Sequence, residues 1–413
     1  MNSELSNVYQ KIGSTICLLP FFNAFVKESA AGHSIQPCCM WTGDPHFSTS
    51  GRIGQDLNSD LMRDTRRLHA ENRGDQVDGC FKCYQTEKQG YVSERLKANQ
   101  TVSEYLSDTN DKLQEIIQND FHVNRLFGLD YFPSRYCNLA CITCFSEAST
   151  TREKLETRIN LRDMVSDSSS YEDLHEILST ASYIALTGGE SLDQPRVLQV
   201  IDQCISSGIA ADLGLYIVTN LTRYNPYVYR KIEQFGKPRM TFSIDGTDSV
   251  FEYQRMGADW QQCERNFSRI VANHPQIAWT INYVVTAVSA VGIPAFLQWA
   301  YLNNIQDVIF TPVHGKDYLE IHALPPESAK KTLDRFNLVI ESFETKADLA
   351  DFANVITTAR SFLDSYQYNA EMSDKFVRRM ILEDIHRPDK YKLYDVIPEL
   401  KKEYQDAQQH ISS

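Results

Sequence analysis

The stretch Cys137-Asn-Leu-Ala-Cys141-Ile-Thr-Cys144 follows the apolar run Leu126–Phe132 and decides how the chain is interpreted. Three thiols lie on one short segment, and thiolates are common ligands of iron–sulfur clusters. Three such ligands can bind three irons of a cubane and leave the fourth iron open. A zinc site normally has a fourth Cys or His nearby, and Phe145-Ser-Glu147 offers none. The motif favours an open cluster; zinc with a distant fourth ligand is the alternative.

Downstream of this run, short apolar stretches alternate with helix-length amphipathic segments. Six stretches are predicted to be strands: Leu126–Phe132, Tyr183–Leu186, Leu215–Val218, Met240–Ile244, Ile277–Val285 and Asp307–Phe310. The segments predicted to be helices are Tyr171–Ala181, Pro195–Ser207, Pro226–Phe235, Cys263–Asn273 and Ile293–Asn303. This alternation indicates an α/β fold with helices outside a parallel sheet. Six units predict a partial (β/α)6 TIM-like barrel.

The length of 413 residues predicts more than one structural unit. We expect residues 1–125 to form a small α+β cluster-binding extension, 126–325 the partial barrel and 326–413 a helical C-terminal segment. Within the first unit, Ile12–Val26 and Ser34–Trp41 are expected to pair as strands, and a helical stretch is expected over Leu96–Asn119.

Composition narrows the class of protein. A formal charge of −13 argues against nucleic-acid binding, which usually needs a basic surface. No apolar run approaches the roughly 20 residues that span a bilayer, and the N-terminus lacks a signal-peptide pattern. We therefore expect a cytoplasmic protein without a membrane partner. Ten cysteines in such a chain indicate metal binding more than disulfides.

Polar residues also collect where the next predicted strands end. The segments are Ala185-Leu-Thr-Gly-Gly-Glu190, Val218-Thr219-Asn220 and Thr241-Phe-Ser-Ile-Asp-Gly246. Barrel enzymes build their sites from such strand ends. Together with the CxxxCxxC loop, the segments resemble the cluster loop and the GGE, TN and SxDG motifs of radical S-adenosylmethionine (SAM) enzymes.

The resemblance implies a role for each matching residue. Cys137, Cys141 and Cys144 would be the catalytic ligands of a SAM-binding [4Fe-4S] cluster. Gly188, Gly189 and Glu190 would hold the SAM amino group, and Asn220 would lie near the nucleoside. Ser243 or Asp245 would face the ribose, and Arg255 would lie near the SAM carboxylate. One position departs from the family, which usually has an aromatic residue where this chain has Thr143; Phe145 is the expected substitute near the adenine.

A second group of cysteines precedes the barrel. Cys17, the pair Cys38-Cys39, and Cys80-Phe-Lys-Cys83 supply enough thiolates for a fully ligated cluster or a tetrahedral zinc site. Their order resembles the SPASM or twitch auxiliary-cluster region of radical SAM enzymes, which usually follows the barrel. The resemblance implies an auxiliary [4Fe-4S] cluster bound by Cys17, Cys39, Cys80 and Cys83, with Cys38 as the alternative to Cys39.

The same resemblance implies reductive cleavage of SAM to a 5′-deoxyadenosyl radical that removes a hydrogen atom from a substrate. It favours a peptide or protein substrate and an electron donor such as flavodoxin or ferredoxin. One alternative is the same chemistry on a small biosynthetic molecule. The other is a non-catalytic iron–sulfur or zinc protein with a redox or scaffold role. Cys204 and Cys263 are expected to be structural, and His314 is a candidate substrate contact.

Overall fold

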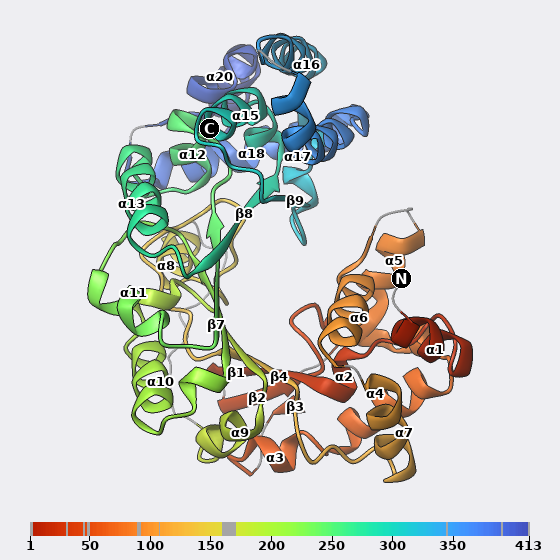
Figure 1. Ribbon diagram of the computed structural model, residues 1–413. Coiled ribbons are helices and arrows are strands. Elements are labelled where there is room, and N and C mark those ends of the chain that lie inside the picture. The colour runs from red at the N-terminus through yellow and green to blue at the C-terminus, as the bar shows by residue number, and fades with distance from the viewer. Residues whose placement is uncertain are drawn as a thin grey trace.

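The computed structural model describes residues 3–29, 32–43, 46–47, 50–88, 92–106, 108–158, 171–343, 346–389 and 391–411. Within these ranges, nine strands form one sheet in the order β3-β2-β1-β4-β5-β6-β7-β8-β9 (Figure 1). The strands are β1 Asn23–Ser29, β2 Gly32–Gln36, β3 His46–Phe47, β4 Gly128–Phe132, β5 Tyr183–Leu186, β6 Gly214–Thr219, β7 Lys237–Ser243, β8 Ala278–Val285 and β9 Val308–Pro312.

Helices flank the sheet, and a helix stands at each end of the described part of the chain. Those that precede β6 are α1 Ser3–Lys11, α2 Leu19–Phe22, α3 Ile53–Asp56, α4 Asp60–Ala70, α5 Phe81–Lys88, α6 Glu94–Tyr105, α7 Thr109–Gln118, α8 Thr150–Arg158, α9 Leu174–Thr180 and α10 Pro195–Ser206. Those that follow are α11 Pro226–Ile232, α12 Asp248–Gln254, α13 Trp260–Asn273, α14 Ala287–Ala290, α15 Ile293–Leu302, α16 Pro326–Glu341, α17 Lys346–Asp364, α18 Ala370–His386, α19 Leu393–Val396 and α20 Lys401–Ile411.

The six strands β4 to β9 run parallel and correspond to the six predicted ones. Each is separated from the next by at least one helix, as the alternation of sequence patterns predicts. The sheet curves into an arc whose described edges are β3 and β9, so it does not close into a barrel (Figure 1). The prediction of an α/β partial (β/α)6 barrel is confirmed.

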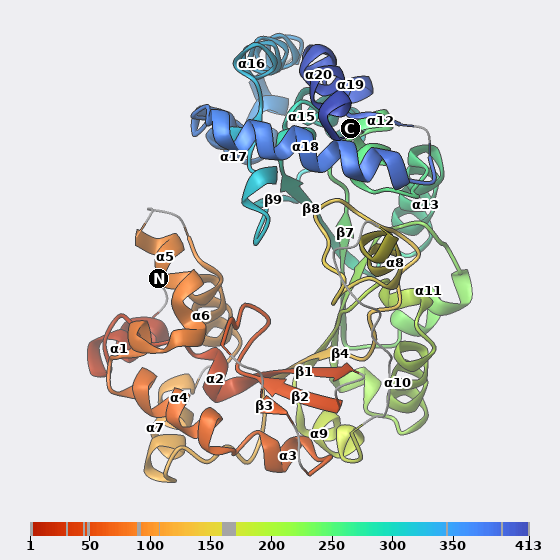
Figure 2. The ribbon, with the colours of Figure 1, turned by 180° about the vertical axis from the view of Figure 1, so that it is seen from behind.

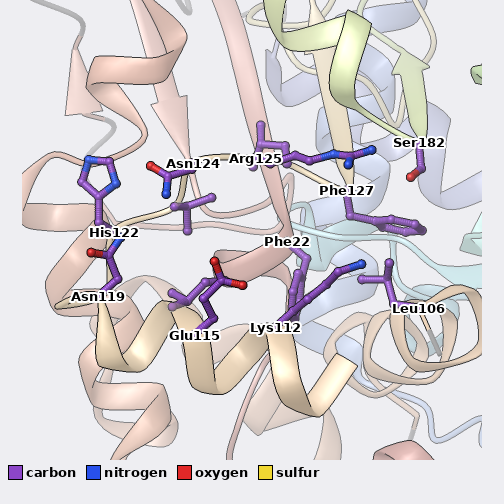
Figure 3. A pocket seen from close by; sticks show the side chains of 13 residues that line it. Phe22, Leu106, Lys112, Glu115, Asn119, His122, Asn124, Arg125, Phe127 and Ser182 are labelled. Carbon is purple, nitrogen blue, oxygen red and sulfur yellow. The ribbon is translucent and has the colours of Figure 1, made fainter. Parts of the chain in front are cut away.

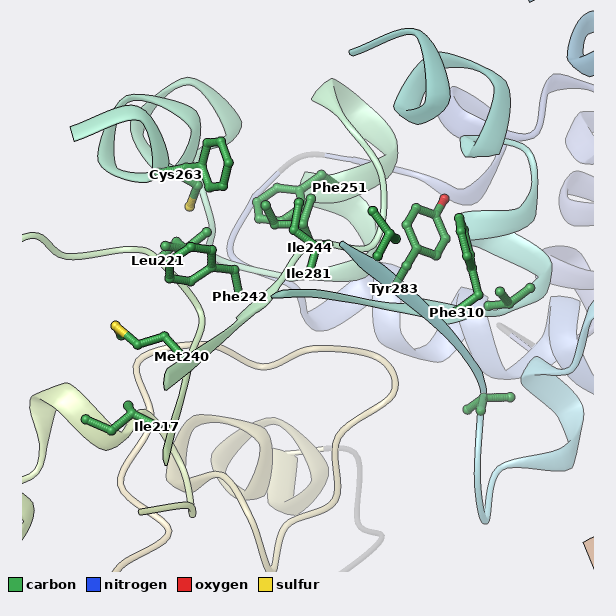
Figure 4. Packing of buried hydrophobic residues seen from close by; sticks show 14 of the residues in the cluster. Ile217, Leu221, Met240, Phe242, Ile244, Phe251, Cys263, Ile281, Tyr283 and Phe310 are labelled. Atoms are coloured by element: carbon green, nitrogen blue, oxygen red, sulfur yellow. The ribbon is translucent and has the colours of Figure 1, made fainter. Parts of the chain in front are cut away.

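Side chains alternate between the two faces of this sheet. In register across four strands, Tyr131, Leu186, Ile217 and Met240 lie side by side in the core beneath the helices. Figure 4 shows how Phe242 of β7 continues this packing toward the helices; its ring lies 5.6 Å from Phe267 of α13. The other face is more polar.

The N-terminal strands add to the same sheet. β1 pairs in parallel with β4, and β2 pairs antiparallel with β1. The sequence-based prediction of a strand over Ile12–Val26 is wrong for its first part, because Leu19–Phe22 turns helically from Pro20 before the strand begins at Asn23. The predicted strand Ser34–Trp41 ends at Gln36, and the predicted helical stretch Leu96–Asn119 consists of α6 and α7.

The chain from Pro326 onward is helical in its described part, as expected. Figure 2 shows α18 crossing this end of the molecule and passing close to α8, which follows the cysteine loop. The site described below depends on that crossing. None of the helices the structure describes is both long enough and apolar enough to span a bilayer.

Candidate active site

The CxxxCxxC segment is a loop that leads from β4 to α8, held by hydrogen bonds to its backbone. The amides of Ala140 and Ile142 donate to the carbonyls of Met256 and Gln254, both at 3.0 Å. From the other side, Ser149 Oγ donates to the Leu139 carbonyl at 2.7 Å. These contacts fix the loop between the C-terminal end of α12 and the start of α8.

The three thiols of this loop affect one another. Burial, together with the nearby Cys141 and Cys144, raises the pKa of Cys137 to about 12. Among the described residues, no three His, Cys, Asp or Glu side chains converge closely enough to bind a single metal ion. A cubane does not require such convergence, because each thiolate binds a different iron. Three neighbouring thiols on one tightly held loop therefore fit a cluster better than a lone zinc ion.

The Gly-Gly-Glu segment after β5 packs directly on the entry to this loop. Gly189 N donates to the Ser134 carbonyl at 3.1 Å, and Glu190 N donates to the Tyr136 carbonyl at 2.8 Å. A Cβ atom at Gly188 would overlap the Ser134 carbonyl, and one at Gly189 would overlap that of Tyr136. Gly188 also has a φ of +123°, which favours glycine. The glycines thus let two backbone segments meet and bring Glu190 close to Cys137.

The Glu190 carboxylate is buried and accepts three hydrogen bonds. Its donors are Thr219 Oγ1 at 2.7 Å, the amide of Asn220 at 2.6 Å and the amide of Leu192 at 3.3 Å. A carboxylate has about four acceptor positions, so one is left for a further donor. Burial raises the pKa of Glu190 to about 7, although these hydrogen bonds lower it. The carboxyl is suited to accept a cationic amine.

Asn220 links the ends of β5 and β6 to the cysteine loop. Its Nδ2 donates to Asn138 Oδ1 at 2.9 Å and lies 3.9 Å from Cys137 Sγ. Its Oδ1 accepts from the amide and the hydroxyl of Thr222, at 3.0 and 2.7 Å. The intervening Leu221 has a φ of +63°, a conformation that is unusual for leucine and occurs often at functional sites. Sequence analysis did not single out Asn138, Leu221 or Thr222.

Two of the residues predicted to contact SAM pair with each other instead of lying free. Arg255 Nη2 lies 2.8 Å from Asp245 Oδ2, and both side chains are buried. Asp245 Oδ1 accepts the amide of Val284 at 2.8 Å. Ser243, at the end of β7, is partly exposed. Arg255 Nε is buried without a hydrogen-bond partner in the described part of the chain, so it can still donate to a ligand.

Lys316, which sequence analysis did not identify, also holds the cysteine loop. Its Nζ donates to the carbonyls of Ile142 and Cys144 at 2.8 and 2.6 Å. Phe145, expected near an adenine, has its ring 5.1 Å from this Nζ and is 41% exposed. Burial and the charge of Arg152 lower the pKa of Lys316 to about 8. No sequence motif indicates this role, because Lys316 lies in the segment after β9, 172 residues from Cys144.

The N-terminal cysteines form a second group. The pKa of Cys38 is raised mainly by burial, and Cys39, Cys17 and Cys80 raise it further. Burial likewise raises the pKa of Cys80, with further contributions from Cys17 and Cys83. The side chain of Cys39 is exposed.

His69 and Arg95 hold this second group together. The amide of Cys17 donates to His69 Nδ1 at 3.1 Å, so in the neutral ring the proton is on Nε2, which lies 3.6 Å from Cys80 Sγ. Arg95 Nη1 donates to the Ser14 and Ile16 carbonyls at 2.8 and 2.7 Å, and the Glu87 carboxylate pairs with the same guanidinium. Histidine spacing alone did not identify His69.

The remaining candidates lie apart from these groups. Cys204 and Cys263 are buried in α10 and α13, as expected of structural cysteines. His314 is exposed on the loop after β9. A pocket of about 230 Å³ lies between α7 and the start of β4. Figure 3 shows the side chains that line it. This pocket is at the opposite ends of the strands from Glu190 and Asn220 and contains none of the predicted site residues.

Comparisons with known proteins add little at the level of sequence. No protein-family model matches the chain, and no curated protein matches it. Among solved structures, anSMEcpe with bound AdoMet and the Cp18Cys peptide is 18% identical, with a TM-score of 0.37, over 63% of this chain and 67% of that one. Streptococcus suis SuiB bound to the precursor peptide SuiA is 12% identical, with a TM-score of 0.39, over 80% and 74%. SuiB bound to S-adenosylmethionine is 11% identical, with a TM-score of 0.36, over 85% and 76%. Similarities this low carry no functional information.

Proposed function

We propose that this chain is a radical SAM enzyme. The main support for the proposal is that the Gly-Gly-Glu segment packs against the cysteine loop. There, Glu190 N donates a hydrogen bond to the carbonyl of Tyr136, the residue before Cys137. Asn220, at the end of the neighbouring strand, bonds to both Glu190 and Asn138. Three thiols and a buried carboxyl thus share one edge of a parallel sheet, where such folds build their sites.

Each residue has a distinct role in this proposal. Cys137, Cys141 and Cys144 hold the [4Fe-4S] cluster, and the free acceptor position of Glu190 receives the SAM amino group. Gly188 and Gly189 keep that carboxyl against the loop. Asn220 contacts the nucleoside, and Arg255 Nε donates toward the SAM carboxylate. Because Asp245 is engaged with Arg255 and Val284, Ser243 is the better candidate for the ribose.

When bound, the cluster and SAM would supply a 5′-deoxyadenosyl radical that removes a hydrogen atom from the substrate. The chain's own contribution is to orient SAM and to exclude water from its polar end. Burial of Glu190, Asn220 and Arg255 meets the second requirement.

We infer that Cys17, Cys38, Cys80 and Cys83 bind an auxiliary [4Fe-4S] cluster. Cys38 is partly buried and interacts electrostatically with Cys17 and Cys80, whereas the side chain of Cys39 is exposed. From the sequence, Cys39 is the expected fourth ligand and Cys38 its alternative. The present assignment chooses Cys38 and leaves Cys39 as a free thiol. Zinc at the same four residues is the competing possibility.

The substrate proposed is a peptide or protein. An open sheet edge at β9 leaves one side of the arc unclosed, which suits a substrate larger than a metabolite. A small biosynthetic molecule is the alternative. The proposal also includes a flavodoxin or ferredoxin as electron donor, which follows from the resemblance of the motifs. It includes a cytoplasmic location, which is the expectation from the hydropathy of the sequence.

Metal analysis of anaerobically purified and reconstituted protein tests the proposal. Two clusters predict about eight irons per chain, and a Cys137/Cys141/Cys144→Ala variant should retain about four. About four irons in the native chain, all lost in the variant, would assign zinc to the N-terminal group. Zinc at both sites, with no iron, would contradict the proposed enzyme and support a redox or scaffold protein instead.

A further inference from the structure

Lys316 is a buried cation without a full counter-charge. The residue is 6% exposed, and its Nζ donates to the carbonyls of Ile142 and Cys144 and lies over the ring of Phe145. In the part of the chain that the structure describes, no carboxylate lies within ion-pair distance of it. Burying an ammonium group without an anion costs desolvation free energy. An anionic group next to Lys316 would offset this cost.

A larger charged network lies behind this lysine. Arg152 of α8, which follows the cysteine loop, has no exposed surface and binds Glu383 of α18 with two hydrogen bonds of 2.8 and 2.6 Å. Arg152 Nε also donates to Glu156 at 2.9 Å, and Arg379 donates to Glu383 at 3.2 Å. The separation in sequence between Arg152 and Glu383 is 231 residues, so α18 of the C-terminal segment completes the network.

The charges of this network do not balance. Lys316, Arg152 and Arg379 are three cations, and Glu383 and Glu156 are two carboxylates, which leaves one positive charge in excess. Lys316 Nζ lies 2.6 Å from the Cys144 carbonyl, and Arg152 belongs to the helix that directly follows the cysteine loop. The excess charge therefore faces the cysteine loop.

We propose that this network is the built-in counter-charge of the cysteine loop, with Lys316 as its positioning residue and α18 as its support. The inference rests on the proposed function. A loop whose three thiolates hold a cluster is anionic, and reduction adds one more negative charge. A cation fixed beside it stabilises the reduced form more than the oxidised form. The C-terminal segment thereby sets how easily the cluster accepts an electron.

The test is an EPR-monitored redox titration of the reconstituted full chain. The signal that changes on addition of SAM identifies the cluster of the cysteine loop. In Lys316→Met the midpoint potential should shift to more negative values, and in Lys316→Arg it should stay near the native value. In Glu156→Gln, which adds one positive charge to the network, it should shift the opposite way. Lys375→Met, on the exposed side of α18, is the matched control and should shift nothing.

A purely structural lysine would not give shifts of opposite sign. An unchanged potential in Lys316→Met, with native iron content, overturns the inference; equal shifts in Lys316→Met and Lys375→Met also overturn it. If Lys316→Met does not fold, the sign of the Glu156→Gln shift decides, and a zero or negative shift contradicts the inference. If the native chain carries no SAM-responsive cluster, the proposed function itself has failed.

Discussion

At the scale of single residues, Glu190 is a site residue whose charge changes near neutral pH. Burial raises its pKa from 4.5 to about 7 in the folded chain. Between these values the folded chain retains a proton that the unfolded chain has lost. The stability that this carboxyl contributes is therefore complete below about pH 4.5 and is lost as the pH rises through about 7. The same rise creates the carboxylate that a cationic amine requires.

SAM affinity should therefore increase by roughly tenfold between about pH 5.5 and 7.5 in the native protein. In Glu190→Gln the affinity should be lower by roughly 10- to 100-fold, because a charge-assisted hydrogen bond is lost. The variant should also lose the pH dependence. Equilibrium dialysis of SAM at several pH values measures both quantities. Native affinity in Glu190→Gln would remove Glu190 from the SAM site.

The adjacent Cys38 and Cys39 give a second residue-scale prediction. Cys38→Ser should lose the auxiliary cluster, about four irons per chain, because its thiol belongs to the group with Cys17 and Cys80. Cys39→Ser should retain all the iron. Iron and sulfide analysis after identical reconstitution distinguishes them, and loss of iron in Cys39→Ser alone would reverse the assignment.

At the scale of elements, the turn after β5 determines whether the cysteine loop is correctly placed. A methyl group at Gly189 would overlap the Tyr136 carbonyl, which is backbone and cannot move aside without displacing the loop. Gly189→Ala should therefore lose most of the loop cluster, as measured by iron content. Gly54→Ala is the control, because its added methyl would only touch Asp173. Equal iron in both variants would mean that this docking is unnecessary.

The second element is α18, which is anchored by Glu383. In Glu383→Ala the buried Arg152 loses its bidentate partner, and the free energy of unfolding should fall by about 3–5 kcal/mol. Glu371→Ala removes an exposed ion pair from the same helix and should change stability little. Urea denaturation measures both variants. Similar stabilities would show that α18 is held by its apolar contacts alone.

At the scale of the whole molecule, the sequence predicted what depends on local pattern. The six parallel strands follow from short apolar runs separated by amphipathic helices, and the strand-end motifs lie together because parallel strands end at one edge. Contacts between segments that are far apart in the sequence could not be predicted. Lys316 meets Cys144 across 172 residues, and β1 joins β4 across more than a hundred. Nothing in the local sequence around Lys316 or Asn23 indicates such a partner.

The expected division of the chain at residues 125/126 and 325/326 stays a prediction. The sheet runs without interruption from β1 to β4 across the first of these positions. The Arg152–Glu383 pair crosses the second. Contacts within the described part of the chain therefore cross both expected boundaries.

The central claim is that this arrangement cleaves SAM by a radical route. The most direct measurement is the amount of 5′-deoxyadenosine formed when the reconstituted protein is incubated anaerobically with SAM and dithionite. The native chain should form it, and the Cys137/Cys141/Cys144→Ala variant, treated identically, should form none. A native protein with a full complement of iron that binds SAM and yields no 5′-deoxyadenosine would contradict the account.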